Sequence, residues 1–252
     1  MSADPVSEEP TAPHRPGPAP STANEDVWVI VPTYNEASVV REVVAGIREF
    51  FPHVVGVDDG SSDGSAGELA AAGARVVRHP INMGAGAAIQ TGVDFALRDP
   101  GAELFVMMDA DGQHAVSDAV EMVEAMRTLE VDVLLGSRFL GKQASEMPAS
   151  RRALLRTARV FERMTTGIPL TDAHQGLRVF RRSFAEVLDL HVADMAWASE
   201  FLARVSEHGA RVAEHPVTVQ YTAYSRAKGQ RSINSVNIGV DVLLNRLLRG
   251  HR

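Results

Sequence analysis

The chain has 252 residues with 45% hydrophobic content, enough for one sizeable core, and no cysteine, which excludes disulfides, thiolate zinc sites and a cysteine nucleophile. It contains neither the roughly 18 apolar residues of a membrane span nor an apolar signal-peptide core, so we expect a cytoplasmic protein. The net charge of −7 divides into −4 over residues 1–26, −11 over 27–137 and +8 over 138–252, and such a basic half suits an anionic partner such as a phosphate or a lipid headgroup.

Residues 1–25 hold six of the thirteen prolines and no apolar pattern, which predicts a disordered tail. From residue 26 to 235, apolar strands alternate with segments of helical spacing. The expected strands are 27–31, 54–57, 75–77, 104–108 and 131–135, and the expected helices are 37–50, 65–72, 85–97 and 116–129. This alternation predicts an α/β domain with a single, Rossmann-like, mostly parallel sheet flanked by helices. Residues 236–252 are predicted to form an amphipathic basic helix.

Two carboxylates one residue apart, Asp109 and Asp111, end the apolar run 104–108 and are followed by Gly112, Gln113 and His114. In an open α/β sheet, ligands bind at the carboxyl ends of the strands. Paired carboxylates there repel each other unless a cation joins them, and oxygen ligands favour Mg²⁺ or Mn²⁺. The alternative is that both carboxylates cap the next helix and face water.

Polar segments also follow the first three expected strands. They are Pro32-Thr33-Tyr34-Asn35-Glu36, Asp58-Asp59-Gly60-Ser61-Ser62-Asp63-Gly64-Ser65, and His79-Pro80-Ile81-Asn82-Met83-Gly84-Ala85-Gly86. The first offers a flat ring and an acceptor, the second could bind a base or ribose, and the glycines of the third, Gly84 among them, permit close backbone approach to a ligand. Each segment alone also fits a turn with a helix cap. A P-loop and a dinucleotide-binding glycine motif are absent from the sequence.

Taken in order, VPTYNE, VDDGSSDGS, NMGAGAAIQTG and MDADGQH resemble the family 2 glycosyltransferases, which have the GT-A fold. GSRF (136–139), TDAHQGLRVFRR (171–182) and EHPVTVQY (214–221) agree with this, and the resemblance covers about 27–231. Within the family, the Asp-Ala-Asp-x-Gln-His and Gly-Ser-Arg forms are most similar to dolichol- and polyprenyl-phosphate mannosyl- or glucosyltransferases.

The resemblance implies a role for each matching residue. Pro32, Tyr34 and Glu36 would contact the nucleoside, with Val57 and Asp59 reading its base and ribose. Asp109, Ala110, Asp111 and Gln113 would surround the metal and the diphosphate, with Asp109, Asp111 and Gln113 as metal ligands. Arg138 and Arg151 match arginines that handle the diphosphate or an acceptor phosphate, and Lys228 matches a basic residue on a loop that closes over the site. The family often ends that loop with Gly-x-Ser-Lys, but here it reads Gly229-Gln230-Arg231-Ser232, so the basic residue has moved or is replaced by Arg231.

The expected activity is an inverting, metal-dependent transfer of a hexose from a nucleotide-diphospho-sugar (GDP-mannose or UDP-glucose type) to a polyprenyl phosphate. A bound Mg²⁺ or Mn²⁺ stabilises the leaving diphosphate, and fixed arginines add charge-assisted hydrogen bonds. A hydroxyl acceptor would need a general base, for which Asp172 and Glu200 are the candidates, with His114 and His174 behind them. A phosphate acceptor needs none, because its second pKa is about 6.

The second substrate is expected to meet the basic half of the chain, where Arg138, Arg151, Arg178, Lys228 and Arg231 are available. The segments 151–163 and 236–252 could place the protein peripherally on the cytoplasmic face of a membrane, or simply pack with a solvated arginine face. No nucleic-acid partner is expected. Three alternatives stay open: a hydroxyl acceptor on a glycan or small molecule, a nucleotidyltransferase that builds the sugar nucleotide, and a non-catalytic nucleotide-sugar binding protein.

Overall fold

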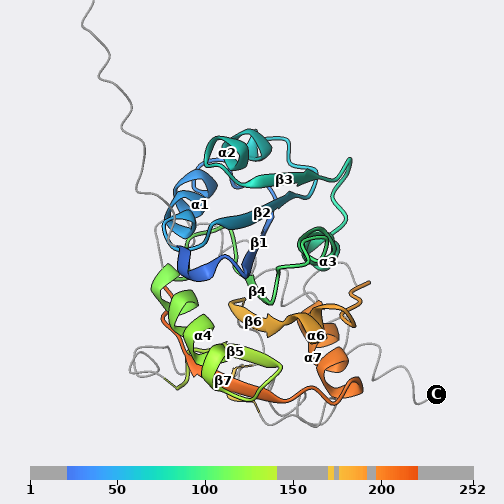
Figure 1. The fold of residues 1–252 in the computed structure, drawn as a ribbon. Coiled ribbons are helices and arrows are strands. Elements are labelled where there is room, and N and C mark those ends of the chain that lie inside the picture. The colour runs from blue at the N-terminus through green and yellow to red at the C-terminus, as the bar shows by residue number, and fades with distance from the viewer. Residues whose placement is uncertain (1–21, 141–169, 173–175, 192–196, 221–252) are drawn as a thin grey trace, which may run out of the picture.

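The structure, a computed structural model, describes residues 22–140, 170–172, 176–191 and 197–220. Within these ranges one seven-stranded sheet has the order β3-β2-β1-β4-β6-β5-β7 (Figure 1). The strands are β1 (Val27–Thr33), β2 (His53–Asp58), β3 (Arg75–Arg78), β4 (Leu104–Met107), β5 (Val133–Ser137), β6 (Arg178–Arg181) and β7 (Val212–Pro216). All pairings are parallel except those of β6, which runs antiparallel to β4 and to β5. The prediction of a single, mostly parallel sheet is confirmed.

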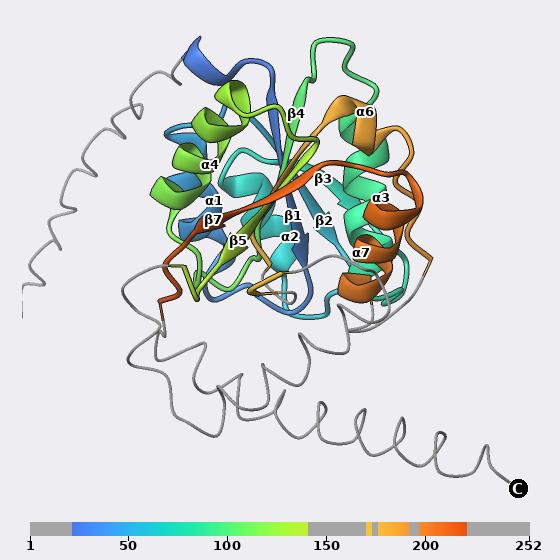
Figure 2. The same cartoon turned by 90° about the horizontal axis from the view of Figure 1, so that it is seen from below.

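Helices cover both faces of the sheet (Figures 1 and 2). One face carries α1 (Val40–Arg48), α2 (Ser65–Ala71) and α4 (Val116–Thr128), and the other carries α3 (Ala85–Ala96), α6 (Arg182–Ala185) and α7 (Trp197–Glu207). Each layer has its own core, because successive strand residues point to opposite faces. Val29 and Val31 join one core, whereas Trp28 and Ile30 join the other.

The strand order reverses between β1 and β4, and the loops that follow these strands emerge together at one edge of the sheet. Such a reversal creates the crevice where α/β proteins bind ligands. Since β6 is antiparallel, its beginning lies at the same edge as the ends of β4 and β5. The topology therefore gathers the segments after β1, β2, β3, β4 and β5 and the segment before β6.

The first helix starts later than predicted, at Val40 rather than Ala37, because the preceding loop is held by the loop after β2. Asn35 takes a left-handed conformation (φ 54°), and its backbone N–H donates to Ser61 Oγ at 2.9 Å. The N–H of Ala37 donates to the Asp63 carboxylate at 3.0 Å. These long-range contacts fix residues that local spacing assigned to the helix.

Strand ends also differ from the predicted ones. β1 continues through Pro32 to Thr33. Proline has no backbone N–H to donate, but on this side of β1 the neighbouring strand β4 has already ended at Met107, so Pro32 is tolerated in the strand. The predicted strand 131–135 begins instead at Val133, since Asp132 is held by Arg211, whose backbone N–H lies 2.8 Å from an Asp132 carboxylate oxygen.

The described chain starts inside the segment predicted as a tail, with a 3-10 helix at Thr22–Asn24 whose Asn24 side chain donates to the Phe50 carbonyl at 3.1 Å. The predicted helix 236–252 lies outside the described residues. No helix in the described part of the chain is long and apolar enough to cross a membrane.

Candidate active site

The carboxylate pair lies where the β4 chain turns back at the crevice. Gly112 has φ +73°, a left-handed conformation that favours glycine, and it reverses the chain after Asp111. The Gln113 N–H donates to Asp111 Oδ1 at 3.0 Å, and its side-chain amide bonds Asp111 Oδ2. The His114 ring contacts Asp109, with Nε2 3.3 Å from Asp109 Oδ2. The His114 side chain is 3% exposed, whereas the Asp109 side chain is 44% exposed. One carboxylate is therefore backed by a buried ring and still opens to the crevice.

The two carboxylates differ in electrostatic environment. Burial raises the pKa of Asp111, and the neighbouring charge of Asp109 raises it further, against the hydrogen bonds from Gln113. Burial also acts to raise the pKa of Asp109, but the hydrogen bond and field of His114 and the charge of Arg178 outweigh it, so the pKa of Asp109 is lowered. A cation between the two would remove their repulsion.

Gly176, just before β6, allows the chain to pass directly over Asp109. A Cβ atom built at Gly176 would overlap Asp109 Oδ2, and it would lie 2.8 Å from Asp109 Cγ and 3.0 Å from His114 Nε2. Any side chain at this position would displace the carboxylate. The glycine is therefore a requirement of the site rather than of the turn alone.

Arg178 was predicted to meet a substrate, but it is 1% exposed and lies inside the domain. It pairs with Met107 across the β4–β6 ladder, and its guanidinium lies 4.6 Å from the ring centre of Trp197 and 4.4 Å from that of Phe201. Two aromatic faces stabilise a buried cation through their ring quadrupoles. Arg178 thus acts on the site through its charge near Asp109.

The loops after β1 and β2 form one unit on the other side of the crevice. The Glu36 N–H donates to Ser65 Oγ at 2.8 Å, and the Ser62 N–H donates to Asn35 Oδ1 at 3.0 Å. Glu36 is buried, Pro32 is half-buried, and Tyr34 is 46% exposed. Of the predicted nucleoside contacts on this loop, Tyr34 presents the accessible surface.

Asp59, predicted to read the base or ribose, binds its own chain in this structure. Its carboxylate accepts hydrogen bonds from the N–H groups of Met83 and Gly84, both at 2.8 Å, and lies 2.7 Å from His79 Nδ1. Gly84, with φ +94°, precedes α3. Asp59 therefore ties the glycine loop to β2. Val57, also predicted to contact the nucleoside, has its side chain fully buried in the core, and its backbone lies in the sheet between Pro32 and Val77.

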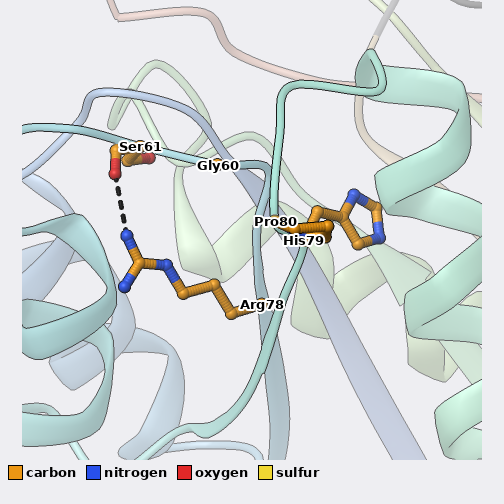
Figure 3. Close-up of a pocket in the computed structure, with 5 residues that line it drawn as sticks. All are labelled: Gly60, Ser61, Arg78, His79 and Pro80. Carbon is orange, nitrogen blue, oxygen red and sulfur yellow. Dashed lines mark hydrogen bonds between the residues drawn. The ribbon is translucent and has the colours of Figure 1, made fainter.

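An open hollow lies between the loop after β2 and the end of β3, lined by Gly60, Ser61, Arg78, His79 and Pro80 (Figure 3). Arg78 and His79 point in opposite directions in this view. Arg78 donates to the Ser61 carbonyl at 3.1 Å and pairs with the buried Asp58 carboxylate at 3.0 Å. The hollow adjoins the predicted nucleoside contacts, and the Arg78 guanidinium on its wall is paired with a buried carboxylate.

Arg138 follows β5 and is held by Asp172. Its Nε and Nη2 donate to the two carboxylate oxygens at 2.6 and 2.8 Å, and its backbone N–H adds a third bond at 3.1 Å. The Asp172 side chain is 1% exposed. Both residues were predicted catalytic; the structure brings them together as a bidentate ion pair, which fixes the guanidinium plane.

The other general-base candidate, Glu200, lies on α7. Its carboxylate accepts the His191 N–H at 3.0 Å and lies 4.0 Å from Arg204. Arg151, Lys228, Arg231 and His174 lie outside the described residues. In the described part of the chain, no group of three or more His, Cys, Asp or Glu side chains is arranged to hold a metal ion.

Sequence reasoning assigned no role to Gly176 or Glu214, although both lie in segments that carry the resemblance. Gly176 lies just before Leu177 and the β6 residues Val179 and Phe180, a position that could have marked a close approach. Glu214 lies in the middle of β7 and binds the Thr171–Asp172 segment, its Oε1 accepting from Thr171 N–H and Asp172 N–H, each at 2.9 Å. A charged residue within a sheet strand was its only local signal.

Comparisons with known proteins agree with this geometry. The family model described as glycosyl transferase family 2 matches residues 28–188. The chain is 33% identical over 213 residues to polyprenol monophosphomannose synthase of Mycolicibacterium smegmatis, covering 80% of each chain. It is 30% identical to undecaprenyl-phosphate mannosyltransferase of Micrococcus luteus, covering 76% of this chain and 82% of that protein. Among solved structures, glucosyl-3-phosphoglycerate synthase of Mycobacterium tuberculosis, in complex with Mn²⁺, uridine-diphosphate and phosphoglyceric acid, superimposes with a TM-score of 0.62 at 15% identity, covering 82% and 74% of the two chains. The fold is GT-A.

Proposed function

The chain belongs to glycosyl transferase family 2, and on that premise we propose that it moves a hexose from a nucleotide-diphospho-sugar to a polyprenyl phosphate with inversion at the anomeric carbon. The observation that carries the proposal is the carboxylate pair Asp109 and Asp111, at the strand-order reversal of a GT-A sheet. The names of the relatives described above support the lipid phosphate as acceptor, since both are enzymes of polyprenyl-phosphate type.

The residues present fit a hard divalent cation. Asp109 and Asp111 supply carboxylate oxygens. Burial, and after it the charge of Asp109, raises the pKa of Asp111, and a cation would relieve the repulsion between the two carboxylates. A site with few protein ligands keeps positions open for diphosphate oxygens, as Mg²⁺ and Mn²⁺ sites do. We assign Asp109 and Asp111 as the ligands; the Gln113 amide instead binds Asp111 in this structure. When bound, Mg²⁺ or Mn²⁺ supplies Lewis-acid stabilisation of the leaving diphosphate.

The donor occupies the side of the crevice formed by the loops after β1, β2 and β3. Tyr34 offers a ring face to the nucleoside, the hollow beside Arg78 lies next to it, and Asp59 holds the 83–84 backbone in place. Gly176 leaves room for the Asp109 carboxylate, and His114 contacts that carboxylate. These residues bind and orient; none needs to transfer a proton.

The acceptor step is a displacement at the anomeric carbon. A phosphate oxygen of the acceptor forms the new carbon–oxygen bond as the bond to the nucleoside diphosphate breaks, and the electron pair leaves with the diphosphate. The attacking phosphate is largely ionised at neutral pH, because its second pKa is about 6, so no base is required. Asp172, bound to Arg138, is assigned to orienting that guanidinium rather than to proton transfer. Arg138 would then meet the acceptor phosphate.

We assign the approach to the lipid to the basic half of the chain. Arg151, Lys228 and Arg231 are proposed to meet the acceptor headgroup, and the segments 151–163 and 236–252 to contact the membrane surface. A single basic amphipathic segment gives reversible binding that weakens with salt.

The test is a donor and acceptor screen with the full chain. GDP- and UDP-hexoses are supplied with a short-chain polyprenyl phosphate and Mn²⁺. The glycolipid and the released nucleoside diphosphate are both quantified, and they should form in equal amounts. The proposal predicts transfer from one donor class, lost in excess EDTA and restored by Mg²⁺ or Mn²⁺. Full activity in EDTA would refute the metal assignment. Transfer to a soluble sugar hydroxyl, with none to the lipid phosphate, would establish the alternative acceptor.

A further inference from the structure

Glu214 lies on the last strand of the sheet, opposite Leu135 in the β5–β7 ladder, and holds the segment that carries Asp172. Its Oε1 accepts three hydrogen bonds at 2.9 Å, from Thr171 N–H, from the Thr171 hydroxyl and from Asp172 N–H. Oε2 also lies 2.8 Å from Thr171 N–H. The Glu214 carboxylate therefore binds the backbone N–H groups of Thr171 and Asp172 and the side-chain hydroxyl of Thr171.

The Thr171 hydroxyl extends this contact to the backbone around Arg138. Thr171 has one hydroxyl proton, and it is donated in a hydrogen bond to the Glu214 carboxylate, which can only accept. Ser137 Oγ, 2.6 Å from Thr171 Oγ1, must therefore be the donor in that bond, and Ser137 Oγ is left to accept the Phe139 N–H at 3.2 Å. The donor and acceptor in each hydrogen bond of this network follow from the Glu214 carboxylate at its end.

Arg138 stands between the two ends of the network. The hydroxyl chain fixes its neighbours Ser137 and Phe139, and Asp172, whose own N–H is bound by Glu214, fixes its guanidinium through two bonds at 2.6 and 2.8 Å. Hydrogen bonds linked in such a chain strengthen one another in a partly buried environment. We infer that Glu214 is a positioning residue for Arg138, acting through Thr171 and Asp172, without contact with the substrate.

The inference rests on the proposed function, in which Arg138 meets a phosphate. A substitution that removes the acceptor group, Glu214→Ala, should weaken use of the short-chain polyprenyl phosphate, lowering kcat/KM for it by about tenfold or more, as expected when several charge-assisted hydrogen bonds are lost. The KM for the sugar nucleotide should stay nearly constant. Glu214→Gln keeps one acceptor oxygen where Oε1 lies and should restore most of the activity. Glu130→Ala, at an exposed carboxylate (96% of the side chain), is the matched control and should behave as the unsubstituted chain.

A double-mutant cycle separates positioning from general structural support. If Glu214 acts through Arg138, Glu214→Ala should cost little once Arg138→Ala is present. Additive losses, or equal changes in the KM values for donor and acceptor, would overturn the inference. If Glu214→Ala fails to fold in thermal denaturation, Thr171→Val replaces it in the cycle, since it keeps the side-chain volume and the backbone N–H but breaks the hydroxyl chain.

A binding measurement tests the coupling between Glu214 and Arg138 independently of turnover. The same cycle is measured on the dissociation constant of inorganic pyrophosphate, a probe for the anion-binding capacity of Arg138. A coupled cycle in a chain that transfers no sugar would reject the proposed function and keep the positioning role. Transfer to the lipid phosphate with uncoupled variants would reject the positioning role alone.

Discussion

Replacing Gly176 by alanine should damage catalysis far more than it damages the fold. The added Cβ would lie 2.8 Å from Asp109 Cγ, which is 0.6 Å short of the 3.4 Å where ordinary contact begins, and 3.0 Å from His114 Nε2. His114 is buried and cannot yield, whereas the Asp109 side chain is partly exposed and can swing away. The Asp109 carboxylate, the proposed metal ligand, therefore moves by roughly half an ångström or more, and misplacement of about 1 Å in a catalytic group can lower turnover by about a hundredfold.

We expect Gly176→Ala to lower kcat by about tenfold to a hundredfold and to raise the Mn²⁺ concentration needed for half-maximal rate. The assay is transfer to the short-chain polyprenyl phosphate across a Mn²⁺ titration, with thermal denaturation alongside. Gly67→Ala on α2 is the control: nothing lies within 4 Å of its added Cβ, and it should keep full activity while stabilising the fold by about 0.4–1 kcal/mol. A Gly176→Ala enzyme with unchanged kcat and unchanged Mn²⁺ requirement would refute the reasoning.

Three further predictions concern other parts of the molecule. Asp111→Asn should abolish turnover with the fold retained, because it removes a proposed metal ligand; residual activity that still responds to Mn²⁺ titration as before would argue against this. Removing residues 1–21 should leave turnover on a soluble donor unchanged, given their proline-rich composition, and a folded truncation with little turnover would show otherwise. The hydrogen bond from Arg127 lowers the pKa of Asp26 despite partial burial, so the pair stabilises the fold above the ordinary value of 3.8 and this contribution disappears as pH falls through the lowered value. Asp26→Asn should thus destabilise at neutral pH by up to about 1 kcal/mol, and denaturation curves of the two proteins should converge at low pH; a constant difference would contradict the linkage.

The first half of the fold was predictable because its signals are local. Strands such as Val27–Thr33 are apolar runs, and α1 and α4 show a helical repeat of buried residues, so periodicity locates them to within a few positions. Their ends were less predictable. The start of α1 depends on Ser61 and Asp63, more than twenty residues away along the chain.

The second half carries weaker local signals. β6 is four residues long and is bounded by Arg178 and Arg181, which do not resemble strand residues. Its arginines are accommodated by distant partners: Trp197 and Phe201 stack on Arg178, and the Met126 carbonyl accepts from Arg181 at 2.6 Å. Only the tertiary structure supplies these partners, so a strand there could not be read from spacing.

The carboxylate pair was identifiable from sequence because both residues lie on one short segment after a strand. The pairing of Arg138 with Asp172, and the role of Glu214, were not, since these contacts join residues 34 to 43 positions apart. Arg178 shows the converse. Its charge suggested a substrate contact, but the fold buries it among aromatic rings, and it influences Asp109 at a distance.

The measurement that tests the central claim most directly compares two acceptors that differ only in the phosphate. The full chain, its preferred sugar nucleotide and Mn²⁺ are incubated with a short-chain polyprenyl phosphate or with the corresponding polyprenol. The account predicts glycosylation of the phosphate alone, because an ionised phosphate needs no base and Asp172 is bound to Arg138. Comparable glycosylation of the polyprenol would contradict it.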